Sequence, residues 1–124
     1  MSGLTLEELN ERFVYRRDPG RDRWSVLTSK TGPLIGDCED YALTVLWIEA
    51  GHDVAEMHRM VLRGKAALWR THTMPGPEHT HMMLWVKGKG WIDNTHKKWS
   101  KTPHFAKEDK IGPVMFAASM ILKG

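Results

Sequence analysis

A capped helix that begins at a lone cysteine is the feature that most constrains the fold of this chain. Asp37 is a good N-cap residue and Gly51 favours a helix end, so the sequence predicts a helix whose first residue is Cys38. The apolar residues that recur between them at helical spacing are Leu43, Leu46, Trp47 and Ala50. Because Cys38 is the only cysteine among 124 residues, it can form no disulfide within the chain.

The first turn of a helix is a place where a cysteine can become reactive. Unpaired N–H groups and the helix dipole favour the thiolate there, and the thiolate is the nucleophilic form. The acidic neighbours Asp37, Glu39 and Asp40 oppose this effect. A nearby histidine is therefore needed to supply a compensating positive charge.

Length and composition fit a single globular domain over residues 1–124. Hydrophobic residues make up 41% of the chain, and no apolar run approaches the ~20 residues that span a bilayer. The N-terminus lacks the layout of a signal peptide, so we expect a cytoplasmic protein. The 18 basic residues only slightly outnumber the 15 acidic ones, and nucleic-acid binding is not expected.

The N-terminal third predicts a short helix and a long loop. Thr5 and Glu8 form a capping box for a helix that we expect to end near Tyr15. Residues 16–36 carry several glycines and prolines among polar residues, which is typical of a loop over the surface.

The rest of the chain predicts an antiparallel sheet. The segments with strand character are 57–63, 66–73, 80–86 and 91–93, with a turn at 74–77. Residues 113–122 fit either a helix or a strand, and we favour a strand that completes the sheet.

A hairpin between two of these strands brings a base and an acid together. A three-residue loop, Val86–Gly88, with Gly88 in the left-handed conformation would place His81 directly opposite Asp93. An imidazole N–H could then reach the carboxylate, as in a catalytic triad. A tighter turn would instead place Leu84 opposite Asp93.

These residues resemble the bacterial transglutaminase-like cysteine proteinases. The resemblance lies in Gly36–Ala42 before a helix, in His81 at the start of an apolar strand, and in Trp91–Asn94 at the end of the next. It implies an α+β fold with a papain-like or transglutaminase-like core, in which the nucleophile helix packs on an antiparallel sheet. It also implies that Cys38 is the nucleophile, His81 the general base and Asp93 its orienting partner.

The chain departs from that family in two respects. The interval from His81 to Asp93 is shorter than usual, and the sequence contains no glutamine to serve as a papain-type oxyanion donor. The Cys38 backbone N–H is the first substitute and the Trp24 indole N–H a candidate second donor. Asn94, next to Asp93, is a further support candidate.

The expected activity is that of a cysteine peptidase or amidase on a protein or peptide substrate, without a metal or organic cofactor. Cys38 would form a thioester, and water would resolve it. The same residues would serve a transglutaminase-type acyl transferase if an amine resolved the thioester. We favour hydrolysis because the resemblance is to proteinases.

Two other functional classes stay open. His79 and His81 lie on one face of a strand, as in some zinc sites. Further ligands of such a site would be Cys38, Asp93 or His96. The other class is an interaction module that kept the fold and lost the activity, binding a partner through residues 16–23 or 96–101.

Overall fold

A computed structural model describes residues 4–16, 26–27, 31–72, 80–113 and 115–117, and these form an α+β structure. In chain order, the elements are α1 (Leu6–Arg12), β1 (Phe13–Tyr15), β2 (Leu34–Gly36), α2 (Cys38–Glu49), α3 (Val54–Leu62), β3 (Ala66–His72), β4 (Thr80–Val86), β5 (Gly90–Ile92) and β6 (Asp109–Ile111). Within these described ranges, no helix is long and apolar enough to cross a membrane.

Helix α2 is the central element, and its start is fixed by reciprocal capping. Asp37 Oδ1 accepts a hydrogen bond of 3.0 Å from the Asp40 N–H, and Asp40 Oδ2 accepts one of 3.3 Å from the Asp37 N–H. Gly51 has a φ of 75°, the left-handed conformation that commonly follows the end of a helix. The predicted helix with Cys38 as its first residue is therefore confirmed.

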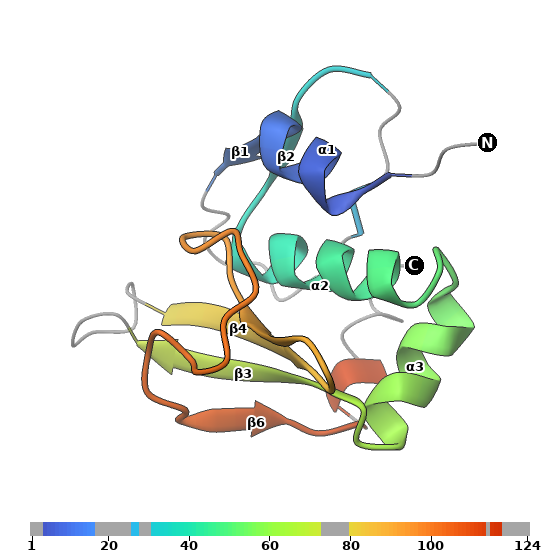
Figure 1. Cartoon of the computed structure of the whole chain (residues 1–124), viewed down its shortest axis with the longest axis vertical. Coiled ribbons are helices and arrows are strands. Elements are labelled where there is room, and N and C mark those ends of the chain that lie inside the picture. The colour runs from blue at the N-terminus through green and yellow to red at the C-terminus, as the bar shows by residue number, and fades with distance from the viewer. Residues whose placement is uncertain (1–3, 17–25, 28–30, 73–79, 114, 118–124) are drawn as a thin grey trace.

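The buried side chains of α2 place it between two layers. Tyr41, Leu43, Val45 and Leu46 are all fully buried, although they do not share one face of the helix. Figure 1 shows α2 lying between the unit formed by α1, β1 and β2 and the larger sheet. Helix α3 follows α2 at one end of that sheet.

The larger sheet is antiparallel, with the strand order β5-β4-β3-β6. Its core face carries alternate residues of β4, Met82, Leu84 and Val86, which join the same hydrophobic cluster as the buried residues of α2. On the other face, the Nζ of Lys107 lies 5.7 Å from the ring centroid of Trp69 and 5.6 Å from that of Trp91. The segment that follows β5 and contains Lys107 thus covers the second face of the sheet.

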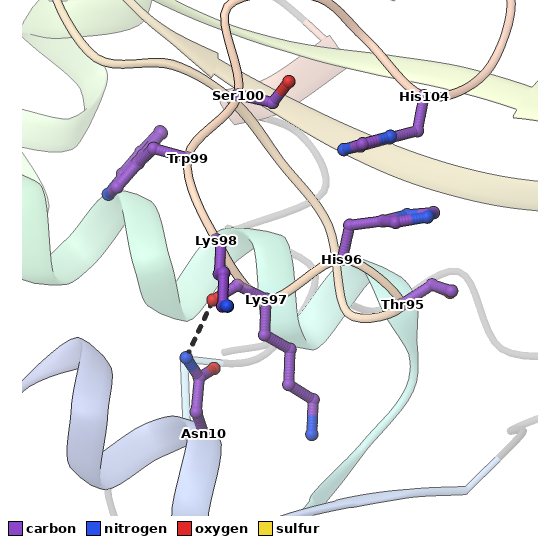
Figure 2. A pocket seen from close by; sticks show the side chains of 8 residues that line it. All are labelled: Asn10, Thr95, His96, Lys97, Lys98, Trp99, Ser100 and His104. Carbon is purple, nitrogen blue, oxygen red and sulfur yellow. Dashed lines mark hydrogen bonds between the residues drawn. The ribbon is translucent and has the colours of Figure 1, made fainter.

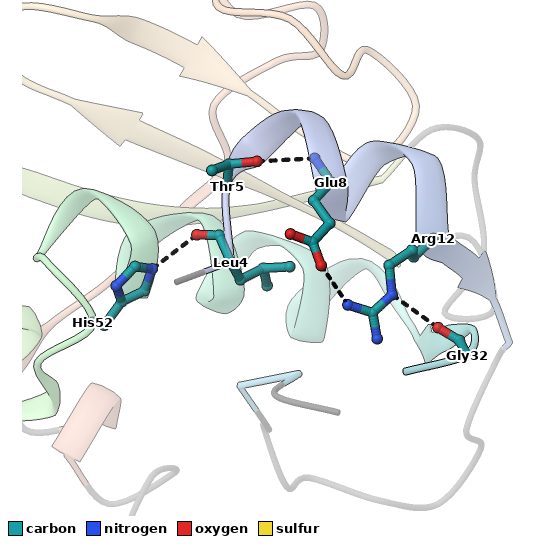
Figure 3. A network of polar contacts seen from close by, with 6 residues as sticks. All are labelled: Leu4, Thr5, Glu8, Arg12, Gly32 and His52. Carbon is teal, nitrogen blue, oxygen red and sulfur yellow. Dashed lines mark hydrogen bonds and ion pairs between the residues drawn. The ribbon is translucent and has the colours of Figure 1, made fainter. Parts of the chain in front are cut away.

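Polar contacts hold α1 against the rest of the molecule (Figure 3). Its N-cap Thr5 accepts a hydrogen bond from the Glu8 N–H, which is one half of the predicted capping box, while the Glu8 carboxylate pairs with Arg12 at 2.7 Å instead of capping the Thr5 N–H. The Arg12 Nε donates to the Gly32 carbonyl at 2.8 Å. The Nε2 of His52 donates to the carbonyl of Leu4, also at 2.8 Å. Both ends of α1 are therefore tied to segments beside α2.

Two expected elements at the edges of the fold differ from the sequence prediction, and one strand is additional. Helix α1 ends at Arg12 because Phe13–Tyr15 pairs in parallel with Leu34–Gly36. The expected loop over residues 16–36 thus ends in a strand, while 17–25 and 28–30 lie outside the described residues, as does the expected turn at 74–77. The strand β6, which completes the sheet, was not predicted.

Two predicted strands are helical. The segment 57–63 lies largely in α3, because Asp53 caps the N–H groups of Ala55 and Glu56, and because Met57 and Val61 are buried one helical turn apart. The structure also describes 113 and 115–117 as helical, so the prediction of a strand there was wrong. Proline in the first turn of a helix loses no intrahelical hydrogen bond, which favours this outcome.

The β4–β5 hairpin differs in register from the expectation. Leu84 pairs with Ile92 and Val86 with Gly90, so the three residues between the strands are Lys87, Gly88 and Lys89. Gly88 has the expected positive φ, 86°. The observed pairing is shifted by two residues relative to a pairing in which His81 faces Asp93. Because the shift is an even number of residues, both side chains still lie on the same face of the sheet.

We expect Gly90→Ala to destabilise the protein far more than Gly88→Ala. Both glycines have positive φ, 104° and 86°, and alanine at either carries a conformational cost of about 1–2 kcal/mol. A Cβ at Gly90 would also collide with the backbone oxygen of Ser100, whereas one at Gly88 meets nothing. Urea denaturation should show a loss of about 3 kcal/mol or more for Gly90→Ala. Equal losses for the two variants would contradict the close approach of Ser100 to β5.

Candidate functional site

The thiol of Cys38 is buried where α2 meets the backbone of β4. The residue is 7% exposed, and the backbone N–H groups of Met82 and of Cys38 itself lie close enough to the sulfur to lower its pKa. Capping by Asp37 fixes the first turn of α2, and packing of α2 on β4 brings that turn to Met82. The sulfur therefore lies near Met82, the residue that follows His81 in β4.

The surroundings of Cys38 favour the neutral thiol. Burial, followed by the negative charges of Asp37 and Glu39, raises the pKa of Cys38 from 9.0 to about 12. The two backbone N–H groups lower the pKa but do not compensate. Of the three acidic neighbours predicted to oppose the thiolate, Asp37 and Glu39 do so and Asp40 does not contribute, while burial has the largest effect. At neutral pH the resting site therefore holds a thiol rather than a thiolate.

His81 and Asp93 form a buried pair. The His81 Nε2 lies 3.5 Å from the Asp93 Oδ1, and the two side chains are 7% and 2% exposed. In the observed register, extension of the ladder would place Met83 opposite Asp93, so His81 is the diagonal neighbour two residues away. Strand β5 ends at Ile92, which frees Asp93 to turn toward His81. The expected direct pairing was wrong, while the expected approach of imidazole to carboxylate is present.

The carboxylate of Asp93 collects several donors at one oxygen. Its Oδ1 accepts hydrogen bonds of 2.8 Å from the N–H groups of Thr95 and His96, and the His96 Nδ1 lies 3.3 Å away. Burial would raise the pKa of Asp93, but the contact with His81 and these N–H groups outweigh it, and the pKa is lowered overall. Asp93 thus stays ionised and stabilises a positive charge on a neighbouring imidazole.

The ring of His81 is oriented by aromatic packing as well as by Asp93. The centroid of the Phe105 ring lies 5.0 Å from that of His81, with the rings nearly perpendicular. The 3.5 Å contact with Asp93 is too long for a well-formed hydrogen bond, so Nε2 lacks a hydrogen-bond partner among the described residues. Catalytic hydrogen bonds are often long in the absence of substrate.

The structure does not join Cys38 to His81 by any hydrogen bond or ion pair among the residues it describes. Cys38 and Met82 belong to the core cluster on one face of β4, and strand alternation directs His81 to the other face. Of the predicted triad, the structure thus brings His81 and Asp93 together, while Cys38 lies near the backbone of Met82 and does not contact His81.

The remaining predicted site residues have different outcomes. Trp24 and His79 lie outside the described residues. The Asn94 Oδ1 is buried and has no hydrogen-bond partner in the described part of the chain. Within that same part, no three histidine, cysteine or acidic side chains are placed to hold a metal ion, so the zinc alternative gains no support there.

Sequence reasoning missed three components of this site. The N–H of Met82 is a backbone group, and nothing in its residue type signals a contact with sulfur. Phe105 comes from a segment with no regular secondary structure, so periodicity gave no indication of it. The contact of His96 with Asp93 could have been predicted from the local sequence. An aspartate side chain commonly accepts hydrogen bonds from backbone N–H groups two or three residues later and so caps a turn.

Comparison with known proteins adds no relative, because no family model, curated protein or solved structure matches the chain.

We predict that Cys38 reacts slowly with iodoacetamide in the native protein. With a thiol pKa of about 12, the thiolate needed for alkylation is scarce at pH 8. The rate should be at least about a hundredfold lower than in the urea-unfolded chain, where a cysteine pKa is about 8.5. Mass spectrometry reads the result directly, since the chain has one cysteine. Equal native and unfolded rates at pH 8 would contradict the buried neutral thiol.

We also predict a pH-dependent stability difference between the wild type and Asp93→Asn. Because folding lowers the pKa of Asp93, its charge stabilises the fold above the unfolded pKa of about 3.9, and this contribution is lost as pH falls through the lower folded value. Urea denaturation should show a deficit of about 1–2 kcal/mol at pH 7 that narrows below about pH 4.

Asp109→Asn is the matched control for this measurement. Asp109 is exposed on β6, so its substitution should change stability by less than about 0.5 kcal/mol. A deficit for Asp93→Asn that stayed constant from pH 7 to pH 3 would show that the charge of Asp93 is not the stabilising element.

Proposed function

We propose that this protein is a cysteine-dependent peptidase or amidase, with Cys38 as nucleophile, His81 as general base and Asp93 as its orienting partner. The observation that carries the proposal is the buried His81–Asp93 pair, at 3.5 Å, beside the strand residue that contacts the Cys38 sulfur. A helix that begins at the nucleophile and packs on an antiparallel sheet supports a papain-like or transglutaminase-like core. The sequence resemblance described above points to the same class.

The neutral thiol determines the order of proton transfer in this mechanism. As the Cys38 sulfur attacks the substrate carbonyl, its proton passes to His81, whose Nδ1 is the nitrogen turned away from Asp93. Asp93 stabilises the imidazolium that forms. His81 then donates this proton to the leaving amine, and a thioester remains on Cys38. Because His81 has no contact with the thiol at rest and is directed to the other face of β4, the mechanism requires the start of β4 to rearrange when substrate binds, so that the imidazole reaches the sulfur.

Two backbone N–H groups are the proposed oxyanion donors. Those of Cys38 and Met82 lie close enough to the sulfur to lower its pKa, so they would also lie near the carbonyl oxygen of an acyl group bonded to it. Met82 thereby offers a second donor without the glutamine that the sequence lacks. Backbone donors need no reorganisation during the reaction, which makes them effective in stabilising a developing charge.

Hydrolysis is the favoured outcome for the thioester. Water releases the acid and regenerates Cys38, whereas an amine would make the protein a transglutaminase-type acyl transferase. Both products follow from the same three residues. The resemblance to proteinases favours water, and the mechanism uses no metal or organic cofactor.

A second candidate is a non-catalytic interaction module. The observation in its favour is the state of Cys38, which is 7% exposed and has a pKa raised to about 12. A buried neutral cysteine commonly acts as a small apolar residue in the core. In such a module, His81 and Asp93 would stabilise the end of the hairpin rather than serve in catalysis.

Hydrolysis of a peptide mixture by the purified protein tests the proposal. We expect cleavage that is lost in Cys38→Ala and lowered at least about a hundredfold in His81→Ala. Asp93→Ala should lower the rate by a smaller factor than loss of the base, while the slow alkylation of Cys38 stays unchanged.

His72→Ala is the matched control. His72 lies at the end of β3, and its imidazole, like that of His81, pairs with a carboxylate, here that of Glu108 outside the proposed site. Its activity should equal that of the wild type. Cleavage that survives Cys38→Ala would exclude Cys38 as nucleophile. If no member of the peptide mixture is cleaved and no thioester adduct forms on Cys38, the interaction module becomes the better description.

A further inference from the structure

A pocket with basic walls lies next to the proposed site. Its volume is about 540 Å³, which is within the range of ligand sites in proteins. We call it the basic pocket, and its lining residues are Asn10, Thr95, His96, Lys97, Lys98, Trp99, Ser100 and His104. Figure 2 shows these side chains, with the two imidazole rings lying parallel on one side.

The lining groups of the basic pocket favour a ligand that accepts hydrogen bonds and carries negative charge. No aspartate or glutamate lines it, whereas two lysines and two histidines do. The exposed Lys98 has no ion-pair partner among the residues the structure describes. The rings of His96 and His104 stack at 3.7 Å with an angle of 11°, which brings two further potential N–H donors together.

The walls of the basic pocket are held in place by the fold. The Asn10 Nδ2 donates to the Lys97 carbonyl at 3.0 Å, and the Asn10 Oδ1 accepts from the Tyr41 hydroxyl at 2.6 Å. Ser100 exchanges backbone hydrogen bonds of 2.7 and 2.9 Å with Trp91. The pocket is thus largely formed before a ligand arrives, which lowers the entropic cost of binding.

One residue connects the basic pocket with the proposed catalytic pair. His96 lines the pocket, and both its N–H and its Nδ1 contact the Asp93 oxygen that faces His81. A ligand in the basic pocket therefore lies close to a peptide bond that is held at His81.

We propose that the basic pocket binds an acidic side chain of the peptide substrate, close to the bond that is cleaved. This inference rests on the proposed function and names its substrate class. A glutamate or aspartate carboxylate matches the donors of the pocket, and Lys98 offers it a charge that no described residue pairs with. Charged hydrogen bonds to lysine and imidazole distinguish such a residue from its amide analogue.

Peptide binding to Cys38→Ala tests the proposal without turnover. The probes are two blocked peptides, Ac-Ala-Ala-Glu-Ala-Ala-NH₂ and its glutamine analogue, titrated against the ¹⁵N-labelled full chain and observed by NMR. We expect the glutamate peptide to bind about five- to tenfold more tightly. Its largest shift changes should fall in residues 95–100 and at His104.

Charge-reversed variants distinguish a local site from a general effect of net charge. Lys98→Glu should remove the preference for glutamate, and Lys98→Gln should weaken it. Lys110→Glu makes the same charge change at an exposed residue on β6, outside the basic pocket, and should keep the preference. These lysines are exposed, so none of the substitutions should disturb the fold.

Three results would overturn the inference. They are equal affinity for the two peptides, equal effects of Lys98→Glu and Lys110→Glu, and no binding of either peptide. Failure of the proposed function is separately visible. A glutamate preference without any cleavage by the wild type would leave the basic pocket as a binding site and remove the catalytic role. Cleavage without a preference for glutamate would remove only the basic pocket from the mechanism.

Discussion

The burial of α2 on most sides is the constraint on which the rest of this structure depends. A helix of this kind needs a layer on each side, and α1 with the β1–β2 pair provides one while the sheet provides the other. The reciprocal caps at Asp37 and Asp40 satisfy N–H groups that would otherwise be unpaired at a buried helix start. The same packing places Cys38 against the Met82 backbone and removes it from water. Position and protonation state of the thiol thus have one common cause.

Asp93 shows how a strand end can hold two histidines. Because β5 stops at Ile92, the next residue is free of the ladder and its carboxylate caps the turn that follows. His81 reaches that carboxylate from β4, and His96 reaches it from the turn itself. The carboxylate therefore connects the proposed base to the wall of the basic pocket. A change in the charge of either imidazole will therefore alter the electrostatic environment of the other.

Local signals determined what could be predicted from the sequence. The α2 boundaries, the Thr5 cap and the β4 strand were predictable because caps, glycines and apolar periodicity all lie within a few residues. Most of helix α3 was predicted as a strand because Met57 and Val61 also suit a strand, although Asp53 caps the helix. The predicted hairpin register was wrong by two residues, because the three-residue loop is Lys87–Lys89 rather than Val86–Gly88. The raised pKa of Cys38 depends mainly on burial, which no short motif encodes.

Asn10 links the first helix to the basic pocket, and thermodynamic linkage follows from that arrangement. Its side chain accepts a hydrogen bond from the buried Tyr41 of α2 and donates one to the Lys97 carbonyl in the pocket wall. Figure 2 shows the second of these contacts. Any local unfolding of α1 breaks both hydrogen bonds and loosens the wall. Linkage is reciprocal, so a ligand that requires an ordered wall must also favour the docked state of α1. The N-terminal helix, although far in sequence from His81, therefore belongs to the same cooperative unit as the proposed binding site.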